Sequence, residues 1–185
     1  MTVDALIEAL IEREGDYSNH PADRSGPTRF GVTEATARAH GYGGPMALLP
    51  RDEAAAIYRR VYWLRPRFDE VARRSPRIAA DLFDTGVNMG PGIASTFLQR
   101  ALTALNRETR DYPDLVPDGC VGAVTLAALD AFLEARGDPG GETVLLRALE
   151  ALQGERYLRL AEKRPANELF LYGWLANRIG NMEQS

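Results

Sequence analysis

Apolar residues recur along this chain mainly three and four positions apart, which is the period of an α-helix. In the first such segment the apolar positions are Val3, Leu6, Ile7, Leu10 and Ile11. The same period predicts further helices over 51–64, from 76 to a Met-Gly-Pro-Gly break at 89–92, and over 93–105, 121–136, 142–163 and 166–182. In the helix over 51–64 we expect the inward side chains to be Ile57, Tyr58, Val61 and Tyr62.

The period-two alternation of a β-strand does not extend over any length of the chain. At most, the residues TRFGVT at 28–33 form a short ribbon, and Thr33 can then cap a short helix that Gly41 ends. A Pro-rich, irregular stretch at 106–119 interrupts the helical pattern. We therefore predict a mainly α fold of two helical lobes, with at most a short β ribbon.

Composition narrows the class of protein. The 185 residues are 45% hydrophobic and 26% charged, as in a soluble globular chain. The net charge of −4 argues against nucleic acid as a partner, because phosphate binding relies on excess Lys and Arg. The one cysteine, Cys120, excludes an internal disulfide, and its place beside Val121 predicts a buried small side chain.

The N-terminal segment MTVDALIEALIERE has no basic leader, and Asp4 and Glu8 break its apolar run. We therefore expect neither a secretory signal nor a membrane span, and no stable membrane association. On this expectation the protein is made and kept in the cytoplasm unless something else releases it.

Residues 12–33, EREGDYSNHPADRSGPTRFGVT, gather charged and turn-forming residues in one loop after the first helix. Glu14 follows Leu10 by four residues, so it continues the apolar stripe at the C-terminal end of that helix, which Gly15 ends. Burial and the helix dipole would both raise its pKa, as a general acid requires. The spacing fits equally well a Glu that points into water or pairs with Arg13, Arg24 or Arg29.

Asp23 is a second carboxylate candidate, nine residues after Glu14. A Glu at a helix end that faces an Asp and a Thr, here Thr28, on the following loop suits sugar hydrolysis. Taken alone, Asp23 between Pro and Gly is more typical of a turn residue that bonds its own backbone. Two distant histidines, His20 and His40, make a weak case for a metal, so we expect no metal and no organic cofactor.

The loop resembles the signature of glycoside hydrolase family 108, the phage-type N-acetylmuramidases. The matching positions are Glu14, Gly15, Tyr17, Asn19, Pro21, Asp23, Gly26, Thr28, Phe30, Gly31 and Thr33. Asp16 departs from the family, which usually has a second Gly there. The segment DTGVNMG at 84–90 also resembles the family, in a turn that lies beside its substrate cleft, although Asn88 in that segment is slightly more typical of a helix C-cap than of sugar binding.

The rest of the chain resembles the partner domain of that family, a small helical domain predicted to bind peptidoglycan. The resemblance rests on PDGCVGAVTLAAL at 117–129 and FLYGWLANRI at 170–179. It implies a lysozyme-like catalytic lobe at 1–92 and a helical peptidoglycan-binding lobe at 93–185 packed on it. Trp174 and Tyr172 could stack on sugar rings, but aromatic residues at helical spacing are more often part of a core.

The resemblance implies cleavage of the β-1,4 bond between N-acetylmuramic acid and N-acetylglucosamine. Glu14 is then the general acid, Asp23 the second carboxylate and Thr28 the residue that holds the attacking water. Tyr17, Asn19 and Asn88 would bind the glycan strands. The resemblance implies either a phage or prophage endolysin, which reaches the periplasm or wall through a holin-type pore, or a muramidase that assists toxin or chitinase secretion. The alternatives are a lytic transglycosylase, a non-catalytic wall-binding module, and a regulatory helical domain with a protein partner.

Overall fold

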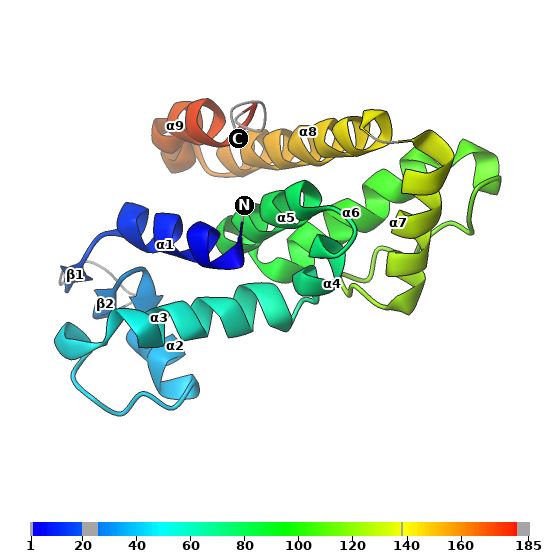
Figure 1. Cartoon of the computed structure of the whole chain (residues 1–185). Helices are drawn as coiled ribbons and strands as arrows, with labels where there is room; N and C mark the ends of the chain where they lie inside the picture. The colour runs from blue at the N-terminus through cyan, green and yellow to red at the C-terminus, as the bar shows by residue number, and fades with distance from the viewer. Residues whose placement is uncertain (1, 20–25, 138, 181–185) are drawn as a thin grey trace. The chain divides into compact units, whose positions relative to one another are not determined.

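The computed structural model describes residues 2–19, 26–137 and 139–180 and consists of helices joined mostly by short turns (Figure 1). The chain divides into two compact units, Met1–Arg65 and Pro66–Ser185. The prediction of a mainly α fold with a short ribbon is confirmed. Within the described ranges, no helix combines the length and the apolar composition needed to cross a membrane.

The first unit contains three short strands between its helices. Its elements are α1 (Val3–Glu14), β1 (Tyr17–Ser18), β2 (Thr28–Arg29), β3 (Val32–Thr33), α2 (Glu34–Ala39), η1 (Met46–Leu48), α3 (Arg51–Tyr58) and η2 (Arg59–Leu64). The strands form an antiparallel sheet in the order β1-β2-β3, so the predicted ribbon is present with one additional strand. As predicted, Thr33 caps α2: its hydroxyl accepts a hydrogen bond from the Thr36 N–H at 3.2 Å.

Helix α1 packs on α3 through its apolar stripe. Ile7, Leu10 and Ile11 are buried, as the period of the sequence predicts. Ion pairs also join α1 to α3, from Glu8 to Arg51, and α1 to η2, from Asp4 to Arg59. Because these pairs are largely exposed, each contributes about 1 kcal/mol or less, and the apolar stripe provides most of the stability.

The predicted helix over 51–64 changes type in the middle. After Tyr58 the chain continues as a π-helix, η2, whose wider turn adds a residue to each hydrogen-bonded loop. As a result Trp63 is buried, whereas Val61 and Tyr62 are only half-buried. Val61 and Tyr62, expected to point inward, are thus covered only in part, because the π-helical turn changes the face that each residue presents.

The second unit is built from helices. Its elements are α4 (Phe68–Ala72), α5 (Pro76–Met89), α6 (Pro91–Leu105), η3 (Arg107–Thr109), α7 (Ala123–Arg136), α8 (Gly140–Lys163), η4 (Pro165–Asn167) and α9 (Glu168–Arg178). In this unit α5 contacts α4, α6 and α8, and α8 also contacts α7 and α9. Figure 1 shows α9 lying beside the C-terminal half of α8.

Helix α5 begins and ends as the sequence predicts. The Ser75 hydroxyl accepts a hydrogen bond from the Ile78 N–H at 3.0 Å, Pro76 occupies the first turn, and Gly90 follows the last residue. A carboxyl group, Asp81, is also buried in this helix. Burial, together with the nearby charges of Asp84 and Glu150, raises the pKa of Asp81 to about 8.

The buried side chain of Gln99, in α6, forms hydrogen bonds with the end of the irregular stretch at 106–119. The Gln99 amide Nε2 donates to Asp118 Oδ1 at 2.8 Å and to the Cys120 carbonyl at 3.0 Å. Cys120 therefore serves the fold through its backbone, and its side chain is exposed. The prediction that Cys120 is buried is wrong: the neighbouring Val121 is buried, but Cys120 itself is exposed in the segment before α7.

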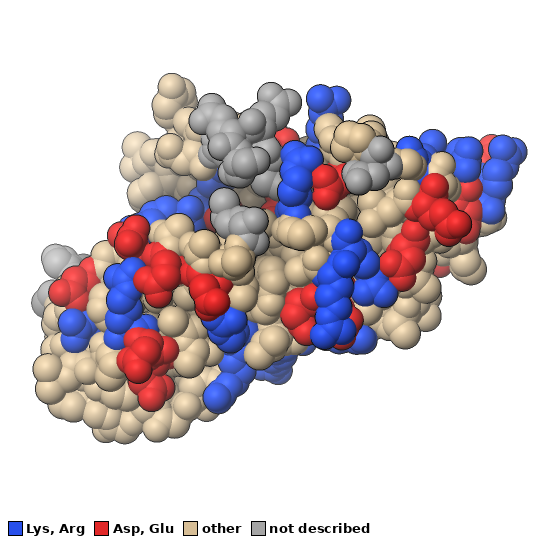
Figure 2. Space-filling model, viewed as in Figure 1, with Lys and Arg blue, Asp and Glu red and all other residues tan. Residues whose placement is uncertain are grey.

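Charged residues of both signs are interspersed on the face of the molecule drawn in Figure 2. Acidic and basic side chains there lie next to one another and are not gathered by sign, a distribution typical of a solvated surface.

The contacts of α8 predict the outcome of a truncation. Removing residues 107–185 deletes α7, α8 and α9 and leaves α5 and α6 without the helix that covers their apolar faces. We expect the shortened protein to be insoluble or to lose its cooperative thermal transition, because the apolar faces of α5 and α6 that α8 covers would be exposed to water. Soluble yield and thermal circular dichroism, compared with the full chain, check this, and a soluble, cooperatively folded product contradicts it.

Candidate active site

Glu14 is the last residue of α1. The Thr2 hydroxyl caps the start of this helix, and Gly15, with φ of +78°, turns the chain away directly after Glu14. The end of the helix therefore lies where the sequence predicts. The Glu14 side chain, however, is exposed, so the burial expected from its place on the apolar stripe is wrong. The reason is local: the residue packed against it is Gly31, which has no side chain to cover the carboxylate.

Gly31 brings the β2–β3 turn close to Glu14 and Tyr58. A Cβ atom built on Gly31 would lie 2.9 Å from Cγ of Glu14 and 2.4 Å from the hydroxyl oxygen of Tyr58. Gly31 also has φ of +74°, a conformation that L side chains rarely adopt. Both the space and the backbone angle thus require glycine at this position.

The residue before it, Phe30, is held in a conformation that is unusual for a bulky side chain. Its φ is +52°, which costs about 1 kcal/mol or more for a residue other than glycine. Three contacts hold it. The Tyr58 hydroxyl donates to its carbonyl at 3.0 Å, its N–H donates to the Asp16 carbonyl at 3.2 Å, and the Arg29 guanidinium lies 4.9 Å from the centre of its ring.

Tyr58 lies next to both this turn and Glu14. Burial raises the pKa of the Tyr58 hydroxyl far above its ordinary value, and the Glu14 charge raises it further. The group therefore stays protonated at any working pH and remains a hydrogen-bond donor. The Tyr58 and Tyr62 rings lie 5.7 Å apart, so the half-buried Tyr62 is next to the same corner.

Asp16 fits the backbone where the resemblance would place a second glycine. Its backbone is not left-handed, so glycine is not needed there. Its carboxylate accepts a hydrogen bond from Arg29 Nε at 2.9 Å, and its carbonyl accepts from Phe30. Asp16 thus helps to hold the β2–β3 turn in place.

The other candidate residues of the loop that the structure describes lie in the small sheet that follows α1 or next to it. Tyr17, in β1, is opposite Arg29, and Thr28, in β2, is opposite Ser18, whose carbonyl accepts from the Thr28 hydroxyl at 3.4 Å. Tyr17 is 43% exposed and Asn19 is also exposed. Asp23 lies outside the described residues.

Asn88 belongs to the second unit and is not a helix C-cap. It lies inside α5, and its amide donates to the Asp84 carbonyl at 2.7 Å and to the Asp84 carboxylate at 3.2 Å. Gly90 is the C-cap residue.

Sequence reasoning did not single out Tyr58, which helical spacing assigned to the core. The signal that could have found it is the Phe30-Gly31 pair, because a two-residue hairpin turn at positive φ needs a specific support. Within the described ranges, no group of three or more His, Cys, Asp or Glu residues is placed to bind a metal ion.

Comparison with known protein families relates two successive parts of the chain to two different domain families. Residues 7–90 match the family model described as glycosyl hydrolase 108, and residues 93–179 match the model described as a predicted peptidoglycan domain. The first part of the chain is therefore similar to glycosyl hydrolase 108 domains, and the second part to a peptidoglycan domain. The two matches meet at residues 90–93, where α5 has ended and α6 begins.

A solved structure has the same fold. SagA from Brucella abortus superposes on the chain with a TM-score of 0.63 and 23% sequence identity, covering 94% of this chain and 87% of that one. At this identity the likeness concerns the fold alone. No curated protein matches the sequence. The family matches identify a glycoside hydrolase with a peptidoglycan-binding domain, and hence a peptidoglycan hydrolase in the broad sense.

Gly31 provides a test of the geometry around Glu14. We expect Gly31→Ala to lower both stability and activity. The added methyl group would clash with Tyr58 and Glu14, and the left-handed backbone conformation at this position is unfavourable for alanine. The loss of stability should be at least about 1 kcal/mol, measured by urea unfolding. Gly43→Ala is the control, since a Cβ there meets nothing within 4 Å and its φ is not in the left-handed region. Equal behaviour of the two variants would contradict the proposed close approach.

Proposed function

We propose that this protein is an N-acetylmuramidase that hydrolyses the β-1,4 bond between N-acetylmuramic acid and N-acetylglucosamine, with Glu14 as general acid. The observation that carries the proposal is the Glu14 carboxylate. It is exposed at the end of α1 and lies against the strained Phe30-Gly31 turn, within the segment that matches the family.

The surroundings of Glu14 favour chemistry over a structural role. Within the described ranges Glu14 forms no ion pair, whereas Arg29 pairs with Asp16 and also donates to the Ala47 carbonyl. A carboxylate placed only for structure would be expected to have such a partner. Strained backbone also tends to gather at functional sites, and the Phe30 conformation is strain of this kind.

The chemistry needs a proton donor and a second polar group on the other face of the sugar. We assign Glu14 to protonate the glycosidic oxygen as the bond to the anomeric carbon breaks. Asp23 then stabilises the positive charge on the sugar ring or orients water, and Thr28 holds the attacking water. The water adds its oxygen to the anomeric carbon and gives its proton to a carboxylate. Tyr17 and Asn19, both exposed beside this site, would bind the glycan.

A lytic transglycosylase is the second candidate, because such an enzyme can act with a single Glu and the exposed Glu14 suits that role equally well. The soluble products distinguish the two reactions. Hydrolysis leaves a reducing N-acetylmuramic acid end, whereas transglycosylation leaves a 1,6-anhydro end that is lighter by one water. Mass spectrometry of products from purified sacculi separates them.

Glu14→Gln tests the general acid. We expect the release of soluble fragments from sacculi to fall by about 100-fold or more, since general acid catalysis contributes at least this much. The melting temperature should change little, because the side chain is exposed. Glu12→Gln, an exposed Glu two residues earlier in α1, is the matched control and should keep full activity. A Glu14 variant with substantial activity would rule out the assignment.

Asp23→Asn and Thr28→Ala test the other two roles. Each should lower the rate of sacculus hydrolysis by about tenfold or more while the melting temperature stays nearly unchanged. Hydrolysis rate and thermal unfolding are measured on the same preparations. If activity and several degrees of melting temperature are lost together, the residue supports a turn and does not take part in the reaction.

A further inference from the structure

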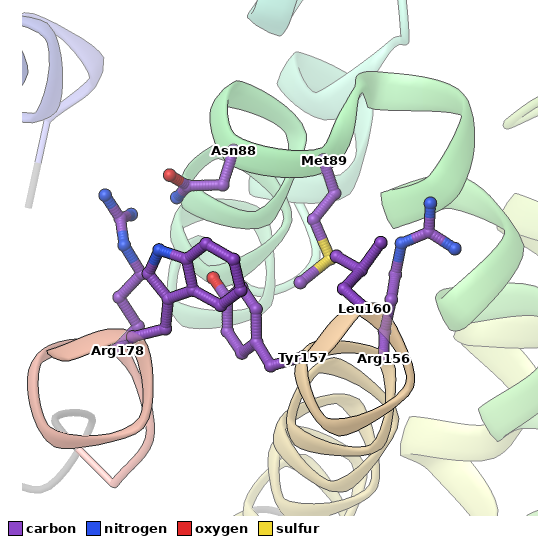
Figure 3. Close-up of a pocket in the computed structure, with 7 residues that line it drawn as sticks. Asn88, Met89, Arg156, Tyr157, Leu160 and Arg178 are labelled. Carbon is purple, nitrogen blue, oxygen red and sulfur yellow. The ribbon is translucent and has the colours of Figure 1, made fainter. Parts of the chain in front are cut away.

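A pocket of about 270 Å³ opens in the second unit between α5, α8 and α9 (Figure 3). Its walls are formed by Asn88, Met89, Arg156, Tyr157, Leu160, Trp174 and Arg178. All of these residues belong to the second unit. Of the glycan-binding residues expected from the sequence, only Asn88 is among them.

The charged side chains that line the pocket are basic, and one of them is paired with Asp84. Two of its seven lining residues are arginines and none is acidic. Arg178 is fixed in place, because its Nη1 donates to both carboxylate oxygens of Asp84 at 3.2 and 3.3 Å. Arg156 is different: its Nε is buried and has no hydrogen-bond partner within the described ranges, where it also makes no ion pair. A buried donor without a partner costs free energy, which an acceptor on a ligand would recover.

The remaining walls suit a ligand with amide and alkyl groups. The Asn88 amide nitrogen is occupied by Asp84, which leaves its Oδ1 to accept a hydrogen bond from a ligand N–H. Figure 3 shows Met89 and Leu160 lining the space between Asn88 and Arg156. Aromatic rings close the apolar side, with Trp174 stacked on Tyr157 at 5.3 Å between ring centres.

We propose that this pocket binds the peptide stem of peptidoglycan through a free carboxylate. A carboxylate, an amide N–H and short alkyl side chains are what the arginines, Asn88 and the apolar wall would each recognise. The stem carries these groups, whereas the sugar rings of the glycan strand are uncharged. The inference rests on the proposed function, since it names the part of the wall that the second unit recognises.

The site makes peptide-bearing strands better substrates than bare glycan. Contacts made to the stem, away from the bond that breaks, contribute binding energy to the enzyme–substrate complex.

Titration with a soluble stem tests the proposal without hydrolysis. The probe is the pentapeptide L-Ala-γ-D-Glu-L-Lys-D-Ala-D-Ala with free carboxylates, measured by isothermal titration calorimetry against the full chain. Its fully amidated counterpart, which has no carboxylate, is the second probe. We expect saturable binding of the acid peptide and binding of the amidated peptide at least about tenfold weaker.

Two variants and a control locate the binding. Arg156→Gln and Asn88→Leu should each weaken binding of the acid peptide, Arg156→Gln by about tenfold or more. Arg147→Gln makes the same charge change on α8 at an exposed position nine residues earlier, which is the opposite side of that helix, and should bind as the unaltered protein does. Circular dichroism checks that each variant is folded.

The outcomes separate this proposal from the proposed function. If the unaltered chain binds no peptide, binds both peptides equally, or binds the acid peptide unchanged after Arg156→Gln and Asn88→Leu, the stem site is ruled out. Hydrolysis of peptide-free glycan by the unaltered chain would still stand in that case. Conversely, loss of the muramidase assignment leaves the peptide titration unaffected, because the probe contains no glycosidic bond.

Discussion

The burial of one face of α5 organises most of the second unit. Ile78, Leu82 and Phe83 are almost completely excluded from water, and the helix contacts α4, α6 and α8. At Gly86 a Cβ would make an ordinary contact of 3.4 Å with the Phe68 ring, so α4 packs directly beside this part of α5. Because α5 lies within the match to the hydrolase family, and α6 and α8 within the match to the peptidoglycan domain, the two family segments share one hydrophobic core. They are separate in sequence but not in packing.

The first unit depends on a different constraint, the narrow space at the end of α1. Only glycine fits at position 31, and the strained Phe30 before it is supported by the hydroxyl of a buried tyrosine, Tyr58. This arrangement fixes the turn beside Glu14 while leaving the carboxylate accessible to water. A rigid support and an exposed acid are both needed if Glu14 is to meet a polymer from outside the protein.

Of the two proposed sites, one carries the catalytic acid and the other binds the peptide stem. The acid is carried by the end of a helix in the first unit, and the pocket is formed by three helices of the second. The pocket depends on the same α5 packing, since Asn88 and Met89 reach it from the last turn of that helix. Arg178 is anchored on Asp84, also in α5, so α5 contributes to the charge of the pocket as well as to its shape.

The sequence by itself determined the features that depend on residues close along the chain. Helix α1 and its buried Ile7 and Leu10 follow from a period of 3.6 residues, and the start of α5 follows from the Ser75 cap. The motif around Glu14 likewise indicates the family from the sequence alone, because its residues lie close together along the chain.

Only the tertiary structure decided which of these residues are covered by others. Glu14 lies on the apolar stripe yet is exposed, because the neighbour that reaches it is a glycine seventeen positions away. Tyr58 supports the turn from a helix distant in sequence, and the pocket brings Asn88 and Arg178 together across ninety residues. A local pattern fixes the direction of a side chain on its own helix, but its burial and its partners depend on which element packs opposite, and that is a property of the whole folded chain.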